Sequence, residues 1–145
     1  MKATIVYHSR RGRTAGYARE MAMHLWTKGM SVKCCATADF KPEMLEECDL
    51  LLLGCWTSGW FVINQYPNHR WVDFAKQLPT SLPKHLLLFS TYKFRTGSMF
   101  RGMKRYLSLR DVEQVETLQS KTGFLSPEDK RRLDEYVNQI KKQKQ

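Results

Sequence analysis

A run of four leucines, Leu50 to Leu53, followed by Gly54 and Cys55, constrains the fold more than any other part of this sequence. A continuous apolar run ended by a glycine is typical of a β-strand that is buried on both faces. Residues 85–90 form a second run of the same kind. Strands buried on both faces occur in parallel sheets that helices cover from either side, so the sequence predicts an α/β fold.

Strand and helix patterns alternate along the rest of the chain. The apolar and β-branched residues predict further strands over residues 4–7, 31–36 and 112–118, the last of them more polar and therefore expected at a sheet edge. Helical spacing and capping residues predict helices over residues 14–29, 39–48, 71–78, 98–107 and 126–140. Five strands alternating with five helices predict a three-layer sandwich, and right-handed crossovers give a parallel sheet of order 2-1-3-4-5. The length of 145 residues suits a single domain over residues 1–145.

The stretch from Thr4 to Thr14 joins the first predicted strand directly to a helix through a turn that contains a glycine. Such a turn brings unpaired backbone N–H groups and the positive end of a helix dipole to one point, which binds phosphate. Gly12 would let the backbone approach an anion, and Ser9 and Thr14 would add hydroxyl donors. The alternative is that the glycine and the capping threonine serve only to turn the chain.

The residues of this turn, Ser9-Arg10-Arg11-Gly12-Arg13-Thr14, resemble the phosphate loop of flavodoxins, commonly written Ser/Thr-x-Thr-Gly-x-Thr. The resemblance implies a flavodoxin-like fold and a loop that holds the phosphate of FMN. Arg11 stands where the family usually has a threonine, and Arg13 where a small polar residue is common, so one hydroxyl donor is missing. An arginine turned toward the phosphate would replace that donor, whereas arginines that point to solvent would contribute much less.

The loops that follow the predicted strands at residues 50–55 and 85–90 should meet this first loop, because the carboxyl ends of parallel strands lie at one edge of the sheet. An isoalloxazine ring needs aromatic plates and backbone hydrogen bonds, and the resemblance implies that both loops flank the ring. The alternative is that these aromatic residues only cover the end of the sheet. The residues predicted to contact the flavin in these loops are Trp56, Thr57, Ser58, Gly59, Trp60, Thr91, Tyr92, Phe94 and Gly97.

We therefore expect an FMN-binding, flavodoxin-like electron-transfer protein, in which the protein supplies position and electrostatics and the flavin supplies the chemistry. A second interpretation is a flavin-dependent reductase or quinone-linked dehydrogenase on the same fold. A third is a flavin-free, flavodoxin-shaped domain that binds acidic partners. The four cysteines form no C-x-x-C pair and have no histidines at ligand spacing, so we predict no metal site, and we assign no catalytic residue.

The formal net charge of +10 separates this chain from typical flavodoxins, which are strongly acidic. A positive field favours acidic partners, so we expect a redox partner with an acidic docking face. No nucleic-acid-binding motif is present, and we expect no nucleic-acid partner. Peripheral membrane contact and the oligomeric state stay open. No apolar run approaches the roughly 20 residues of a membrane span, and no signal peptide precedes the first strand, which predicts a cytoplasmic location.

Overall fold

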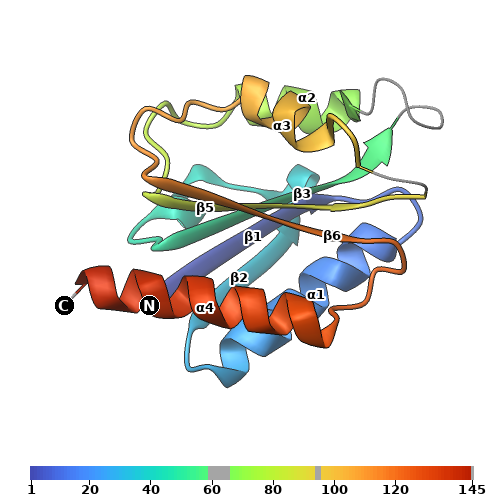
Figure 1. Ribbon diagram of the computed structural model, residues 1–145. Helices are drawn as coiled ribbons and strands as arrows, with labels where there is room; N and C mark the ends of the chain where they lie inside the picture. The colour runs from blue at the N-terminus through green and yellow to red at the C-terminus, as the bar shows by residue number, and fades with distance from the viewer. Residues whose placement is uncertain (59–65, 94–95, 145) are drawn as a thin grey trace.

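The computed structural model describes residues 1–58, 66–93 and 96–144, and it has three layers around one sheet (Figure 1). The parallel strands lie in the order β2-β1-β3-β5-β6, which confirms the predicted order of five strands. Their bounds are β1 Lys2–His8, β2 Ser31–Ala36, β3 Leu50–Ser58, β5 His85–Thr91 and β6 Gln114–Ser120. Helices α1 (Arg13–Thr27) and α4 (Pro127–Lys144) cover one face of the sheet, and α2 (His69–Lys76) and α3 (Met99–Arg105) cover the other.

The sheet separates two apolar cores, and strand β3 contributes to both. Leu50 and Leu52 face the core that contains residues of α1 and α4, whereas Leu51 and Leu53 face the core that contains residues of α2 and α3. None of these four leucines is exposed to solvent. The apolar run that predicted a strand buried on both faces is therefore the centre of the molecule.

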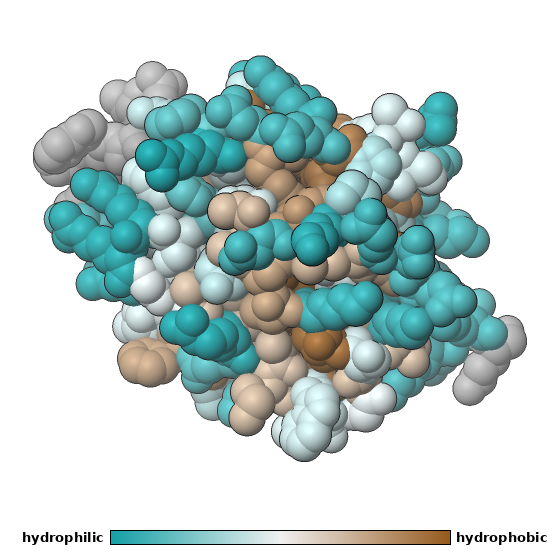
Figure 2. Space-filling model, turned by 180° about the vertical axis from the view of Figure 1, so that it is seen from behind, coloured by the Kyte–Doolittle hydropathy of each residue, from teal (hydrophilic) through white to brown (hydrophobic). Residues whose placement is uncertain are grey.

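Strand β2 forms the edge of the sheet at the back of Figure 1. Seen from behind, apolar surface shows through the middle of a face that hydrophilic side chains otherwise cover (Figure 2). On this strand Lys33 and Cys34 are exposed. A lysine on an edge strand opposes pairing with another strand, because its charge would have to be desolvated.

A short antiparallel strand at the end of β3 was not predicted. Strand β4 (Tyr66–Pro67) pairs with Thr57 and Ser58, so β3 extends beyond the predicted end at Cys55. A two-residue strand carries no periodicity, and the sequence therefore gives no signal for it.

The predicted helix over residues 39–48 is wrong. Two short 3₁₀ helices occur instead: η1 (Thr37–Asp39) ends where the predicted helix begins, and η2 (Pro42–Leu45) lies within it. Between them, Phe40 packs edge-on against Phe74 of α2, with ring centroids 5.3 Å apart. The Met44 carbonyl then accepts a hydrogen bond of 2.7 Å from the Thr4 hydroxyl of β1. Because two contacts so close in sequence hold the chain against different elements, the segment follows the surface in short turns.

The end of α1 and the start of α4 are as predicted. Gly29 follows α1 with a φ of 86°, and the N–H of Met30 donates to the Leu25 carbonyl at 3.2 Å. This is the backbone pattern of a glycine-terminated helix. At the start of α4, the Asp129 N–H donates to the Ser126 hydroxyl at 3.0 Å, and the Ser126 N–H donates to the Asp129 carboxylate at 3.3 Å. The two residues form a reciprocal capping box.

His85, the first residue of β5, is a buried titratable group far from the loops. It is 6% exposed, and its ring packs edge-on against Tyr136 with centroids 6.1 Å apart. Its Nδ1 has no hydrogen-bond partner among the residues that the structure describes. Burial lowers the pKa of His85 below its ordinary value, because the charged form loses its hydration.

We expect the lowered pKa of His85 to make folding pH-dependent. The unfolded chain takes up the proton first, so this part of the stability is complete above the ordinary pKa of about 6.5 and is lost as the pH falls. The free energy of unfolding should therefore decrease more between about pH 7.5 and about pH 5.5 in the wild type than in His85→Leu. Urea unfolding across this range measures both curves. Parallel curves for the two proteins would contradict the assignment to His85.

Candidate functional site

The ends of three neighbouring strands lie level at one edge of the sheet. His8 of β1 is opposite Cys55 of β3, and Trp56 of β3 is opposite Thr91 of β5. These strand ends lie at the right of Figure 1. The three loops that the sequence singled out therefore start from one edge of the sheet, at the carboxyl ends of the strands, which we call the loop edge.

The first loop has the geometry of an anion-binding turn. Gly12 precedes α1 with a φ of 92°, and none of the described side chains caps the first turn of the helix. The Gly12 N–H donates to the Ser9 hydroxyl at 3.0 Å, which leaves the hydroxyl proton of Ser9 available for another acceptor. A Cβ added at Gly12 would meet no atom within 4 Å. The space beside the positive end of α1 is thus open, and a phosphate group fits the donors that surround it.

Thr14 joins this loop to the end of β5. It is 1% exposed, and its hydroxyl shares a hydrogen bond of 2.6 Å with the hydroxyl of Thr91, which is 4% exposed. Both residues were predicted to bind the cofactor, and the structure brings them into direct contact. Their hydroxyls hold the first loop and the β5 loop together.

We expect Thr14→Val to destabilise the protein by about 1–3 kcal/mol, because the substitution keeps the shape but leaves the buried Thr91 hydroxyl without a partner. Urea unfolding measures this loss. The double variant Thr14→Val/Thr91→Val removes both hydroxyls and should recover most of the stability. A double variant as unstable as the sum of the two single variants would contradict this interpretation.

The three arginines of the first loop are exposed, and Arg10 lies against Trp56 whereas Arg11 and Arg13 both line a shallow cleft between α1 and the loop before α4. The Arg10 guanidinium lies over the Trp56 ring, 5.1 Å from its centroid. An Nη of Arg13 donates to the Lys121 carbonyl at 3.3 Å. Because Arg10 covers one face of Trp56, a planar ligand could stack on that face only after Arg10 has moved.

Beyond Trp56, polar side chains link the end of β3 to the end of β5. The Thr57 and Ser90 hydroxyls share a hydrogen bond of 2.7 Å, and the Ser90 hydroxyl also lies 2.6 Å from the Cys55 carbonyl. The half-buried Trp56 has an indole N–H with no partner among the described residues. The sequence analysis missed Ser90, although a polar residue near the carboxyl end of an apolar strand is a usable signal.

The remaining predicted site residues differ in what the structure describes of them. Tyr92 is half-buried, and its N–H donates to the Ser120 carbonyl of β6 at 3.1 Å. Gly97 is exposed, with a φ of 51°. Ser58 is described only by its backbone, which pairs with Tyr66. Gly59, Trp60 and Phe94 lie outside the described residues.

His8 stands at the end of β1, directly before the first loop. Burial lowers its pKa, the positive charges of Arg70 and His69 lower it further, and a hydrogen bond with the Asn68 side chain opposes them. The Asn68 side chain also accepts a hydrogen bond of 2.9 Å from the Arg70 N–H and caps α2, which therefore begins earlier than predicted. Residues of α2 thus add to the positive potential of the loop edge.

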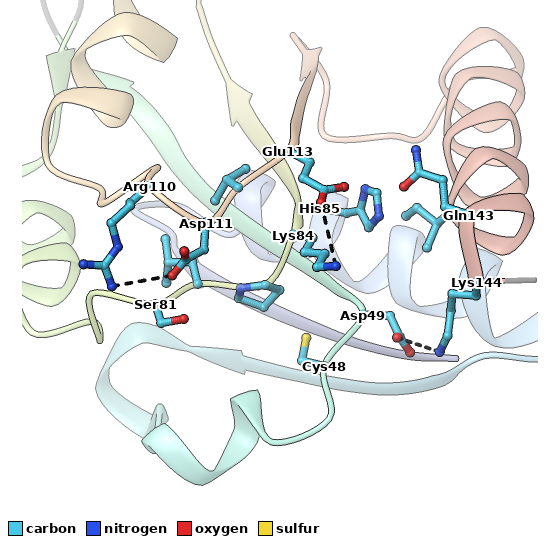
Figure 3. Close-up of a pocket in the computed structure, with 14 residues that line it drawn as sticks. Cys48, Asp49, Ser81, Lys84, His85, Arg110, Asp111, Glu113, Gln143 and Lys144 are labelled. Atoms are coloured by element: carbon cyan, nitrogen blue, oxygen red, sulfur yellow. Dashed lines mark hydrogen bonds and ion pairs between the residues drawn. The ribbon is translucent and has the colours of Figure 1, made fainter.

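A broader hollow of about 1100 Å³ lies at the opposite edge, where β3 and β5 begin. Figure 3 shows that its charged side chains are paired with one another, as Lys84 with Glu113, Lys144 with Asp49 and Arg110 with Asp111. Such paired charges leave little net field to attract a charged ligand. We therefore place the candidate site at the loop edge. In the described part of the chain, no group of three or more His, Cys, Asp or Glu side chains could hold a metal ion.

Comparison with known proteins identifies the fold. No protein-family model and no curated protein matches the sequence. Among solved structures, the flavodoxin of Megasphaera elsdenii is 22% identical with a TM-score of 0.77, over 94% of this chain and 98% of that one. Flavodoxin 2 of Bacillus cereus is 18% identical with a TM-score of 0.70, over 99% of both chains. A mutant flavodoxin of Fusobacterium nucleatum bound to flavin mononucleotide is 18% identical with a TM-score of 0.61, over 98% of this chain and 96% of that one. This agreement over nearly the whole length of both chains shows that the protein has the flavodoxin-like fold.

Proposed function

We propose that this protein binds FMN at the loop edge and functions as an electron carrier. The observation that supports this most is the open, glycine-containing turn before α1, which the hydrogen bond between Thr14 and Thr91 joins to the end of β5, beside the end of β3. The Fusobacterium nucleatum flavodoxin, which has the same fold, binds FMN. When bound, FMN supplies electron-transfer chemistry that no side chain provides.

The residues of the chain have distinct roles in this proposal. The backbone N–H groups in the first turn of α1 and the Ser9 hydroxyl bind the phosphate, which the positive end of the helix also attracts. Arg10, Arg11 and Arg13 raise the local concentration of the anion through their positive charge. The Trp56 ring and the loop after β5 flank the flavin ring, and the unpartnered indole N–H of Trp56 supplies a donor at this edge.

The test is a titration of flavin-free protein with FMN and with riboflavin, which lacks the phosphate, followed by flavin fluorescence. We expect FMN to bind at micromolar concentration or below. Two charge-assisted hydrogen bonds to the phosphate would contribute about 3 kcal/mol, so riboflavin should bind roughly 100-fold more weakly. No FMN binding would favour a flavin-free domain. Equal affinities for FMN and riboflavin would show that the first loop does not bind the phosphate.

An enzyme on the same fold is distinguished by a second measurement on the FMN-loaded protein. A carrier should show no turnover of NADH, NADPH or a quinone in the absence of a partner protein. Steady-state turnover of any of these three substrates would instead identify the protein as a flavin-dependent oxidoreductase. The partner that we propose for the carrier has an acidic docking face, because the chain carries a net charge of +10.

The positive charge should also affect the reduction potential. Fully reduced FMN carries an additional negative charge on its ring, which a cationic protein opposes less than an acidic one. We expect full reduction at a higher potential than in an acidic flavodoxin titrated alongside, and a fall in that potential when salt screens the charges. A redox titration at low and high ionic strength measures both effects. An equally low potential that does not respond to salt would contradict the prediction.

A further inference from the structure

Three bulky apolar side chains are exposed on and beside the outer face of α1. Met23 is 64% exposed, Trp26 is 66% exposed, and Phe124, in the loop before α4, is 69% exposed. Residues three apart on a helix lie on the same face, so Met23 and Trp26 are neighbours. Phe124 lies near the first half of the same helix, because the N–H of Leu125 donates to the Glu20 carboxylate at 3.1 Å. Together these side chains form an apolar row along α1.

Arginines surround the end of this row that lies near the first loop. Arg11, Arg13 and Arg19 line a shallow cleft of about 430 Å³ together with Phe124. Arg19 is four residues before Met23 and shares its face of the helix. None of the three arginines has an ion-pair partner among residues 1–58, 66–93 and 96–144. Among the residues that line the cleft, the Glu20 carboxylate offsets only one of these three charges, so the cleft keeps an excess of positive charge.

The loop that carries Phe124 is held in place before any partner arrives. Gly123 has a φ of 88°, and a Cβ added there would lie 2.8 Å from the Arg13 carbonyl, which shows how closely the loop packs on α1. The Gly123 N–H also donates to the Ser120 hydroxyl at 2.9 Å. A surface whose backbone is already ordered loses less entropy when it binds.

We propose that this surface, Arg11, Arg13, Arg19, Met23, Trp26 and Phe124, binds an acidic segment of a partner protein that also carries bulky apolar side chains. Arginine, methionine, tryptophan and phenylalanine are the residue types enriched in protein interfaces. Carboxylates of the segment pair with the arginines, and its apolar side chains cover Met23, Trp26 and Phe124. The surface adjoins the first loop, but four of its six residues lie outside the proposed flavin site.

The distribution of charge favours a protein segment over nucleic acid or a second copy of this chain. Along α1 the positive charge extends only from Arg13 to Arg19, which is about 9 Å of helix, and apolar side chains follow. A nucleic-acid backbone would leave the cations after a few phosphates and reach apolar surface. A second copy would bring two chains of charge +10 together, and their repulsion opposes association.

Binding of a fluorescein-labelled peptide of glutamate and leucine, followed by fluorescence anisotropy, tests the proposal. We expect the wild type to bind this peptide, and to bind polyglutamate more weakly because polyglutamate lacks the apolar side chains. Arg19→Glu and Trp26→Ser should each weaken peptide binding by about tenfold or more. Lys104 is exposed on α3, on the other side of the sheet, and Lys104→Glu makes the same change in charge. This control should leave the affinity for the peptide within about twofold of the wild type.

Four results would overturn the proposal. They are no binding of the peptide, equal weakening by Lys104→Glu and Arg19→Glu, no weakening by Trp26→Ser, and tighter binding of a single-stranded thymidine oligonucleotide than of the peptide. Thermal unfolding of each variant shows whether it is folded, which the exposure of all three side chains leads us to expect. FMN titration of Arg19→Glu tests whether this surface is distinct from the proposed flavin site. We expect the affinity for FMN to stay within about twofold of the wild type.

Discussion

Gly54→Ala should destabilise the protein by about 1–3 kcal/mol or more, the largest loss that we expect from adding one methyl group. Gly54 lies in the middle of β3, and a Cβ built there would approach the Phe89 ring to 2.0 Å. Phe89 cannot move away easily, because it is fully buried and packs edge-on against Tyr17 with ring centroids 5.9 Å apart. Urea or thermal unfolding measures the loss.

A double-mutant cycle with Phe89→Val isolates the cause of that loss. Valine has no atoms beyond Cγ, so the space over Gly54 opens, at the expense of the stability that the ring provided. In this background Gly54→Ala should be close to neutral, because alanine suits a strand interior better than glycine does. The same loss in both backgrounds would show that contact with Phe89 is not the reason for a glycine at this position.

Gly12→Ala should weaken FMN binding by about tenfold. An L-residue at the left-handed φ of Gly12 costs about 1–2 kcal/mol, and the free loop of the variant relaxes to avoid this strain. Binding must then restore the turn, so the strain appears as lost affinity, at about 1.4 kcal/mol for each factor of ten. FMN titration followed by fluorescence measures the change in dissociation constant.

Gly29→Ala is the matched control for this experiment. Gly29 lies beyond the other end of α1 with a φ of 86°, and a Cβ there would also meet nothing within 4 Å. Gly29→Ala should keep the wild-type affinity for FMN even if it lowers the free energy of unfolding, whereas Gly12→Ala should lose affinity. Equal affinities in the two variants would place the phosphate away from the first loop.

The sequence was sufficient to predict the five parallel strands of the sheet, because the features that determine them are local or follow from general rules. The apolar runs in β3 and β5 mark strands buried on both faces, and the handedness of crossovers fixes the strand order. Connections with contacts distant in sequence were harder to predict. The 3₁₀ turns before β3 depend on Phe40 meeting Phe74 and on Thr4 meeting Met44, and neither pairing leaves a periodic signal.

In the candidate site too, the general arrangement could be predicted but the individual contacts could not. The shared starting edge of the three loops followed from the parallel sheet, since all three leave the carboxyl ends of neighbouring strands. The side-chain pairings did not follow. The hydrogen bond between Thr14 and Thr91 spans 77 residues and depends on the depth at which α1 packs, and the position of Arg10 over Trp56 depends on a rotamer that no pattern of residue types specifies.

Asp49 accepts hydrogen bonds from the backbone N–H of Lys2 at 2.8 Å and from the side chain of Lys144 at 2.7 Å. The first strand and the last helix therefore meet at the edge of the sheet opposite the three loops (Figure 1). A tag or a surface linker attached at either terminus would hold the molecule by this edge. Immobilised on an electrode in that way, the protein would present the loop edge outward to soluble reagents.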